Sequence, residues 1–416
     1  MSTVLVARIP KNGLSTNAAV EQPGSGPNFQ HKPARLESVD LLRGAVMIIM
    51  ALDHVRDYVS GFPYSPTDLA HTTPGLFFTR WITHFCAPIF IFLAGTGSFL
   101  SLGRGKTTRE LSRFLITRGL FLLVLEQTVM RLGWNFRLGA PLWSGILFAI
   151  GMSMIVLAGM IHLPRALMIG ISLVMVLLHN TLDGFHAEFL GKARWLWAIL
   201  HESGNFGHYA DGAVVLRVLY PLIPWLGVMA LGYAAGPIFK MEPARRHRVL
   251  YSLGIGLTLA FIALRWFDVY GNLWHRVHYD SAVLTTLSFF DVTKYPPSLD
   301  YLLMTLGPGI ALLPLLEKAK GRVAQWVLVY GRVPMFYYVL HVYLAHTVGV
   351  LLAMGAGKPV PWLNPAMRLG TLPANSGFEL WVVYAAWIFV FASLYPACKW
   401  WMELKRRRND WWLGYL

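Results

Sequence analysis

The sequence predicts an all-α polytopic membrane protein with about ten transmembrane helices and both termini in the cytoplasm. Of its 416 residues, 55% are hydrophobic and only 14% are charged, which is far more apolar than an ordinary soluble domain. The formal net charge of +15 could indicate a nucleic-acid-binding protein, but the Lys and Arg residues gather in short clusters beside apolar runs. We therefore expect no nucleic-acid partner and interpret the clusters as topology signals.

Ten apolar segments are long enough to cross about 30 Å of hydrocarbon. They are 39–59, 80–102, 113–131, 142–162, 165–183, 213–237, 249–268, 297–316, 324–353 and 378–401. Residues 186–201 are interpreted as an amphipathic element at the membrane interface. Residues 1–34 are polar and rich in Gly, Pro and Asn, so we expect a disordered cytoplasmic tail there. The helical bundle is then expected over 35–402, with a basic cytoplasmic tail at 403–416.

Basic clusters follow the second, sixth, eighth and tenth segments, on the side that both termini share. By the positive-inside rule that side is cytoplasmic. The longer loops lie on the opposite side and are poorer in Lys and Arg. Because long loops on a rigid scaffold often carry binding sites, we expect a substrate to bind on the outer side.

The first segment carries Arg43 and His54 eleven positions apart. At about 100° per residue this pair returns to nearly the same helix face, roughly 16 Å apart along the axis. Ionisable groups at such depth in a membrane are usually functional. Arg suits bidentate phosphate recognition, so Arg43, with Arg35 just before the helix, is the expected contact for a phosphate-bearing ligand.

Several titratable side chains share the outer layer of the predicted bundle, namely Asp53, His54, His84, Glu126 and His341, with Lys294 at the mouth of a later helix. Asp57 follows His54 by three positions and Asp53 by four, so a carboxylate could orient the imidazole as a general base. A hydrogen-bonded packing role stays open for each histidine. For Glu126 we favour a helix-to-helix hydrogen bond, and Arg80 either anchors the interface or contacts an anionic or sugar acceptor.

Further motifs are spread along the chain. They are Arg-Leu-Glu-Ser-Val-Asp-Leu-Leu-Arg-Gly at 35–44 followed by Asp53-His54, the segment 79–95, Lys-Tyr-Pro-Pro-Ser-Leu at 294–299, Gly-Arg-Val-Pro-Met-Phe-Tyr-Tyr-Val-Leu-His at 331–341, and the ending Asp-Trp-Trp-Leu-Gly-Tyr-Leu. Together they resemble the heparan-alpha-glucosaminide N-acetyltransferase catalytic-domain family, a branch of the transmembrane acyltransferases. The spacing of Arg43 and His54 is also similar to that of the related acyltransferase-3 group. The resemblance covers nearly the whole chain after residue 34.

The resemblance implies an enzyme of the bacterial inner membrane. Such an enzyme moves an acetyl or other short acyl group from cytoplasmic acetyl-CoA to an amine or hydroxyl of a glycan or envelope component on the outer side. Lysosomal members place a catalytic histidine in the loop after the first helix, where this chain has His71 at a different spacing. Membrane lipid and a second copy of the chain are candidate partners, and no metal is predicted.

The positions of the residues then lead us to predict the role of each. CoA would contact Arg43 and Arg35, and the catalytic group would be His54 or His84 with Asp53 and Asp57. The acceptor would contact Arg80, Lys294, His341 and Asp68. Direct transfer and an acyl-histidine intermediate both stay open.

Two other classes of protein also stay open. A transporter or flippase for a polar lipid or sugar would use buried charge without consuming acyl-CoA. A haem-binding electron carrier would use His54, His84 or His341 as axial ligands.

Overall fold

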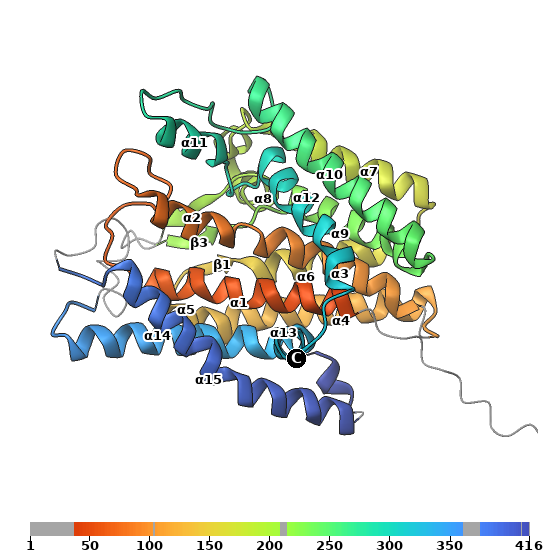
Figure 1. Cartoon of the computed structure of the whole chain (residues 1–416). Coiled ribbons are helices and arrows are strands. Elements are labelled where there is room, and N and C mark those ends of the chain that lie inside the picture. Colours follow the sequence, from red (N-terminus) through yellow and green to blue (C-terminus); the bar gives the residue numbers. More distant parts are fainter. Residues whose placement is uncertain (1–36, 103–104, 209–213, 361–374, 409, 416) are drawn as a thin grey trace, which may run out of the picture. The chain divides into compact units, whose positions relative to one another are not determined.

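The computed structural model describes residues 37–102, 105–208, 214–360, 375–408 and 410–415, so Arg35 and the predicted tail 1–34 lie outside the described residues. The described chain is mostly helical (Figure 1). Its α-helices are α1 (Glu37–Val59), α2 (Pro74–Thr83), α3 (Cys86–Leu102), α4 (Thr108–Leu125), α5 (Arg131–Asn135), α6 (Ile146–Met160), α7 (Arg165–Leu177), α8 (Arg194–Leu200), α9 (Leu222–Ala234), α10 (Pro243–Phe267), α11 (Ala282–Phe290), α12 (Leu299–Leu316), α13 (Arg322–Arg332), α14 (Pro334–Gly355) and α15 (Leu380–Arg407).

Six helical segments in the described ranges are long and apolar enough to cross a membrane, which identifies an integral membrane protein. They are Pro74–Leu102, Leu222–Lys240, Pro243–Phe267, Leu299–Leu316, Pro334–Gly355 and Leu380–Arg407. Each of the ten segments predicted from the sequence contains a helix. The shorter apolar helices α6 and α7 fall below the length of a full crossing, so ten crossings and the cytoplasmic location of both termini stay predictions.

The most charged of the long helices, α1, is surrounded by other helices. It contacts α2, α3, α12, α13, α14 and α15, and it runs between α3 and α14 in Figure 1. Asp40, Asp53 and Arg56 of α1 are all buried. Gly44 and Gly331 let α1 and α13 approach closely, because a Cβ at either position would collide with the backbone of the other helix. The neighbours therefore shield the charges of α1 from lipid.

A small sheet corrects the all-α prediction. Strands β1 (Leu142–Ser144), β2 (Gly204–His208) and β3 (Val214–Val218) pair in the order β1-β3-β2, with β1 parallel and β2 antiparallel to β3. Two of these strands lie inside segments that were predicted to be helical. The sequence Val-Val-Leu-Arg-Val of β3 is rich in β-branched residues, and a short apolar run cannot be assigned to helix or strand by hydropathy alone.

The predicted second helix is interrupted between α2 and α3. Pro88 has no N–H to donate to the carbonyl of His84, which is four residues earlier. The hydroxyl of Tyr301 donates to that carbonyl instead, at 2.8 Å. The break therefore leaves the carbonyl of His84 with a hydrogen-bond donor.

The end of the chain is more ordered than a basic tail. α15 continues to Arg407, and a 3₁₀ turn follows at Trp411–Gly414. Arg118 of α4 donates to the carbonyl of Gly414, and the hydroxyl of Tyr415 donates to Thr117 at 2.9 Å. These contacts hold the C-terminal turn against α4.

Candidate active site

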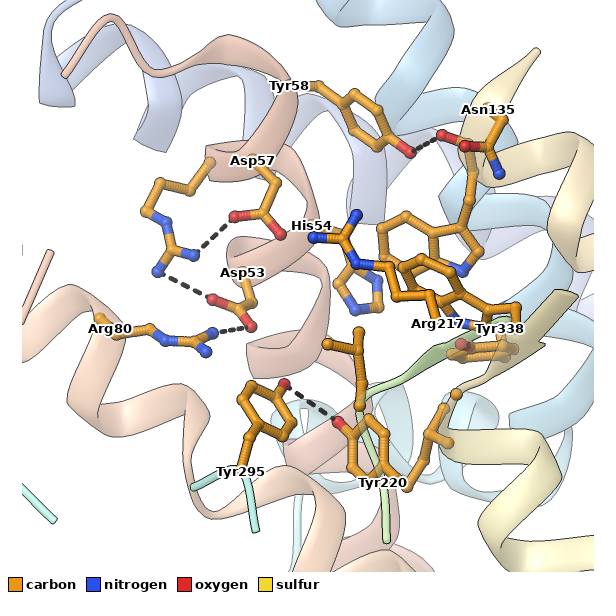
Figure 2. Close-up of a pocket in the computed structure, with 16 residues that line it drawn as sticks. Asp53, His54, Asp57, Tyr58, Arg80, Asn135, Arg217, Tyr220, Tyr295 and Tyr338 are labelled. Carbon is orange, nitrogen blue, oxygen red and sulfur yellow. Dashed lines mark hydrogen bonds and ion pairs between the residues drawn. The ribbon is translucent and has the colours of Figure 1, made fainter. Parts of the chain in front are cut away.

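A cavity of about 410 Å³ lies beside the end of α1 that carries His54. Its walls come from α1, α2, α5, β1, the start of α6, β3, the loops before α9 and α12, and α14. The polar side chains that line it include Asp53, His54, Asp57, Arg80, Arg217 and Tyr338 (Figure 2). The fold therefore brings many distant segments to one chamber.

Asp53 is the centre of a buried ion-pair cluster. Its carboxylate lies 2.8 Å from Arg56 on the next turn of α1 and also pairs with Arg80 of α2, as the dashed lines in Figure 2 mark. The ammonium of Lys294, from the loop before α12, is 4.0 Å away. A buried carboxylate is tolerated only when it is paired. The cluster therefore fixes α1, α2 and this loop relative to one another.

The second carboxylate, Asp57, is more exposed and is paired differently. It accepts from Arg56 at 2.6 Å, and 47% of its side chain is exposed. Both carboxylates that were expected to orient His54 thus have arginine partners. The direct contact that holds the imidazole comes from another helix.

That contact is made by His341 of α14. The Nδ1 atom of His54 lies 2.7 Å from the Nε2 atom of His341, and the two rings are nearly parallel, at 12°. His341 is fully buried, and its Nδ1 atom lies 2.9 Å from the carbonyl oxygen of Tyr337. The edge of Trp134 packs against His54 with ring centroids 4.7 Å apart. His54 is therefore held on its buried side while its ring lines the cavity.

Aromatic rings form much of the remaining wall. Tyr220 and Tyr295 lie with their hydroxyls 3.4 Å apart, and the guanidinium of Arg217 lies over the ring of Trp143, 5.5 Å from its centroid. Burial acts to raise the pKa of Tyr295, but the ammonium of Lys294 and the guanidinium of Arg80 outweigh burial and hold that pKa below its usual range. The cavity therefore combines flat apolar faces with several cationic groups.

Other predicted site residues, His84 and Asp68 among them, do not line the cavity. His84 is buried beside the break after α2, and its Nδ1 atom has no hydrogen-bond partner among the described residues. Asp68 lies in the loop after α1 and is 2.8 Å from the Nδ1 atom of His71. The hydrogen bond from His71 lowers the pKa of Asp68. This carboxyl–imidazole pair is exposed, outside the ion-pair cluster.

The remaining candidates lie elsewhere. Arg43 is at the opposite end of α1, where it pairs with Asp40 at 3.1 Å and donates to the carbonyl of Gly331 at 3.2 Å. Glu126 is buried and accepts from the backbone N–H of Leu147 at 3.1 Å, so it links the end of α4 to the start of α6. The expected helix-to-helix hydrogen bond of Glu126 is confirmed.

The cavity lining also contains residues that were not predicted from the sequence, namely Arg56, Arg217 and the aromatic side chains. Arg56 could have been found, because it follows Asp53 by three positions on the same helix. Arg217 could also have been singled out, because it lies inside the predicted span 213–237. An arginine within a membrane is energetically costly and therefore indicates a functional role. Nothing in the local sequence pairs β3 with β1, so the place of Arg217 in the wall could not be predicted.

The described residues contain no group of three or more His, Cys, Asp or Glu side chains that could hold a metal ion. A family model described as heparan-alpha-glucosaminide N-acetyltransferase, catalytic, matches residues 35–270, which is more than half of the chain. The match includes α1, α2 and β3, and it ends before Lys294 and His341. No curated protein matches the chain.

Proposed function

Because the chain belongs to the heparan-alpha-glucosaminide N-acetyltransferase catalytic-domain family, a family of membrane acetyltransferases, we propose that it moves an acetyl or other short acyl group across a bacterial inner membrane. The donor is acyl-CoA on the cytoplasmic side. The acceptor is an amine or hydroxyl of a glycan or envelope component on the outer side. One observation carries the proposal: an imidazole held by a buried neighbour lines a chamber of about 410 Å³.

His54 is the proposed general base. As the acceptor nitrogen or oxygen attacks the thioester carbonyl, His54 removes its proton. The C–S bond then breaks, and the departing thiolate takes that proton from His54, so that CoA leaves as a thiol. His54 is preferred to His84 because only His54 lines the cavity. The same geometry permits direct transfer without an acyl-enzyme, and no step requires a covalent intermediate.

The cavity wall supports a sugar-bearing acceptor. Ligand pockets are mostly apolar and carry a few polar groups that set orientation, and here aromatic faces such as Trp143 and Tyr220 alternate with Arg217 and the ion-pair cluster around Asp53. Arg80 and Lys294 are proposed to act on the acceptor through that cluster. Asp68, in the exposed loop, is proposed as a peripheral contact.

Arg43 is the proposed contact for the CoA phosphates. It lies eleven residues before His54 on the same helix, or roughly 16 Å along the axis, and a pantetheine arm can cover such a distance. The basic clusters of the sequence predict that the Arg43 end of α1 is cytoplasmic. The donor would thus reach the chamber from the side opposite to the acceptor.

The test is transfer from labelled acetyl-CoA. Purified protein in vesicles is incubated with acetyl-CoA and envelope glycan fractions, and mass spectrometry detects an added acetyl group. His54→Ala should lower the rate on the order of a hundred- to ten-thousand-fold, the usual contribution of a positioned base. His201→Ala is a control, because His201 is a buried histidine that pairs with Asp183 outside the cavity.

Two outcomes would contradict the proposal. Absence of transfer by the wild-type protein with every fraction would remove the proposed activity. Full turnover by His54→Ala, together with loss of turnover in His84→Ala, would move the base to His84.

A further inference from the structure

We propose that His341 is a positioning residue that fixes the tautomer of His54. In this arrangement Nδ1 of His54 carries the proton, and Nε2 presents its lone pair to the cavity. The tautomer follows from the geometry alone, whereas its consequence for catalysis rests on the proposed acyl transfer.

The first step fixes the proton on His341. Its Nδ1 atom lies 2.9 Å from the carbonyl oxygen of Tyr337, one turn earlier in α14. A carbonyl oxygen only accepts hydrogen bonds. The Nδ1 atom of His341 is therefore the donor and carries a hydrogen.

The second step fixes the lone pair. His341 is fully buried, and the neighbours of its two ring nitrogens are an imidazole and a carbonyl oxygen. A buried positive charge without a carboxylate partner would be costly, so His341 is neutral. A neutral imidazole with a proton on Nδ1 has its lone pair on Nε2.

The third step transfers this constraint to His54. The Nε2 atom of His341 is 2.7 Å from Nδ1 of His54. Since Nε2 of His341 can only accept, Nδ1 of His54 donates. Neutral His54 then has its lone pair on Nε2, which is the atom that a general base needs.

Packing keeps both rings in this orientation. His341 stacks on Tyr337 at an interplanar angle of 11°, with Tyr338 edge-on to it. Trp134 packs edge-on against His54. A ring flip of either histidine would exchange the two nitrogens with carbon positions and break the hydrogen bond. The aromatic neighbours therefore preserve the order of donors and acceptors.

His341 takes the place of the carboxylate that orients the catalytic histidine in many hydrolases. Asp53 and Asp57 are engaged by arginines, and a neutral imidazole performs the orienting task without adding charge. When Nε2 of His54 takes the proton of the acceptor, the Nδ1–H of the new imidazolium still donates to His341. The positive charge is then stabilised by a hydrogen bond that already existed.

Chemical rescue separates this role from simple packing. His341→Gly should lower kcat on the order of ten- to a hundred-fold, as loss of an orienting partner does, with the acceptor KM nearly unchanged. Added imidazole should restore part of kcat because it can fill the space and accept from His54. Pyrrole has nearly the same shape and an N–H but no acceptor nitrogen, so it should not. Equal rescue by both molecules, or no loss in the variant, would overturn the positioning role.

His346→Gly is the matched control on the same helix. His346 is also fully buried, and its Nδ1 atom lies 2.9 Å from the carbonyl oxygen of Gly133. Its ring stacks on Tyr58 and Phe136. In the His346→Gly variant, imidazole should restore no more of kcat than pyrrole does. The same pattern of rescue in both variants would count against a specific role for His341.

A spectroscopic measurement tests the tautomer without any assay of activity. The wild-type protein is labelled with ¹⁵N-histidine in lipid, and the His54 signals are identified by their loss in His54→Gln. We expect a protonated Nδ1 and a non-protonated Nε2, and a changed ratio of tautomers in His341→Leu. A proton on Nε2 of wild-type His54 would overturn the inference. The expected spectrum in a protein that transfers no acyl group would support the tautomer and reject the proposed function.

Discussion

At one end of α1, charges from several elements converge on a chamber, whereas at the other end Arg43 pairs with a carboxylate one turn earlier in the same helix. Around Asp53, the partners come from α1, α2 and the loop before α12, and they lie beside the His54–His341 contact. Arg43 instead pairs with Asp40, three residues earlier, and with a backbone carbonyl of α13. The same helix thus has one end at which three cations surround a buried carboxylate and another at which Arg43 contacts Asp40 and a backbone carbonyl of α13.

The difference indicates where substitutions should act. In the Asp53 cluster each charge has partners on other elements, so the loss of one disturbs packing and the site together. At Arg43 a substituted glutamine keeps a hydrogen-bonding side chain beside Asp40 and the carbonyl of Gly331, so it disturbs fewer elements. We therefore expect changes near Asp53 to reduce stability, and changes at Arg43 to reduce mainly the affinity for the donor.

The largest effect on stability should come from Asp53→Ala. Removal of this carboxylate leaves Arg56, Arg80 and Lys294 close together and buried, and breaking a buried ion pair costs about 3–5 kcal/mol of unfolding free energy. Thermal unfolding of the purified protein in detergent measures the loss. Asp57→Ala is the matched control, because that half-exposed carboxylate should contribute only about 0–1 kcal/mol. Equal losses in the two variants would show that Asp53 does not organise this end of α1.

An intermediate effect is expected at the opposite end. Arg43→Gln should raise the KM for acetyl-CoA about ten-fold, which corresponds to about 1.4 kcal/mol of binding free energy, and should leave kcat nearly unchanged. Initial rates over a range of acetyl-CoA concentrations measure both constants. Arg332→Gln serves as the control, since Arg332 pairs with Glu37 at the same end. An unchanged KM in Arg43→Gln would remove this arginine from the donor site.

The smallest effects should come from the loop after α1. Asp68→Asn and His71→Ala should each change the acceptor KM by about two-fold or less, because exposed pairs contribute little. Steady-state rates at varied acceptor concentration provide the measurement. Complete loss of transfer in His71→Ala would place the base in the loop, as in the lysosomal relatives, and the contrast between the two ends of α1 would then need to be revised.

Much of the helical framework could be predicted from the sequence, because hydrophobic runs are local properties. The expected segment 39–59 became α1 (Glu37–Val59), and 297–316 became α12 (Leu299–Leu316). The strands β1 and β3 could not be predicted, since their hydrogen bonds join residues far apart, such as Trp143 and Arg217. Local hydropathy does not record such pairing.

The candidate site divides in the same way. The depth of His54 and His341 follows from their positions in apolar segments, so the sequence placed both in one layer. The contact between His54 and His341 could not be predicted, because 287 positions separate them. The place of His84 outside the cavity wall could not be predicted either. Contact within a layer depends on how each helix is rotated and on which helices are neighbours.

The sequence by itself determined an apolar chain with its charges confined to particular depths, because the cost of burying a charge in a membrane acts at each residue separately. Only the tertiary structure decided which of those charges became partners. Packing brought arginines into ion-pair distance of Asp53 and brought His341 into hydrogen-bond distance of His54. Such interactions require contact distances that packing alone creates.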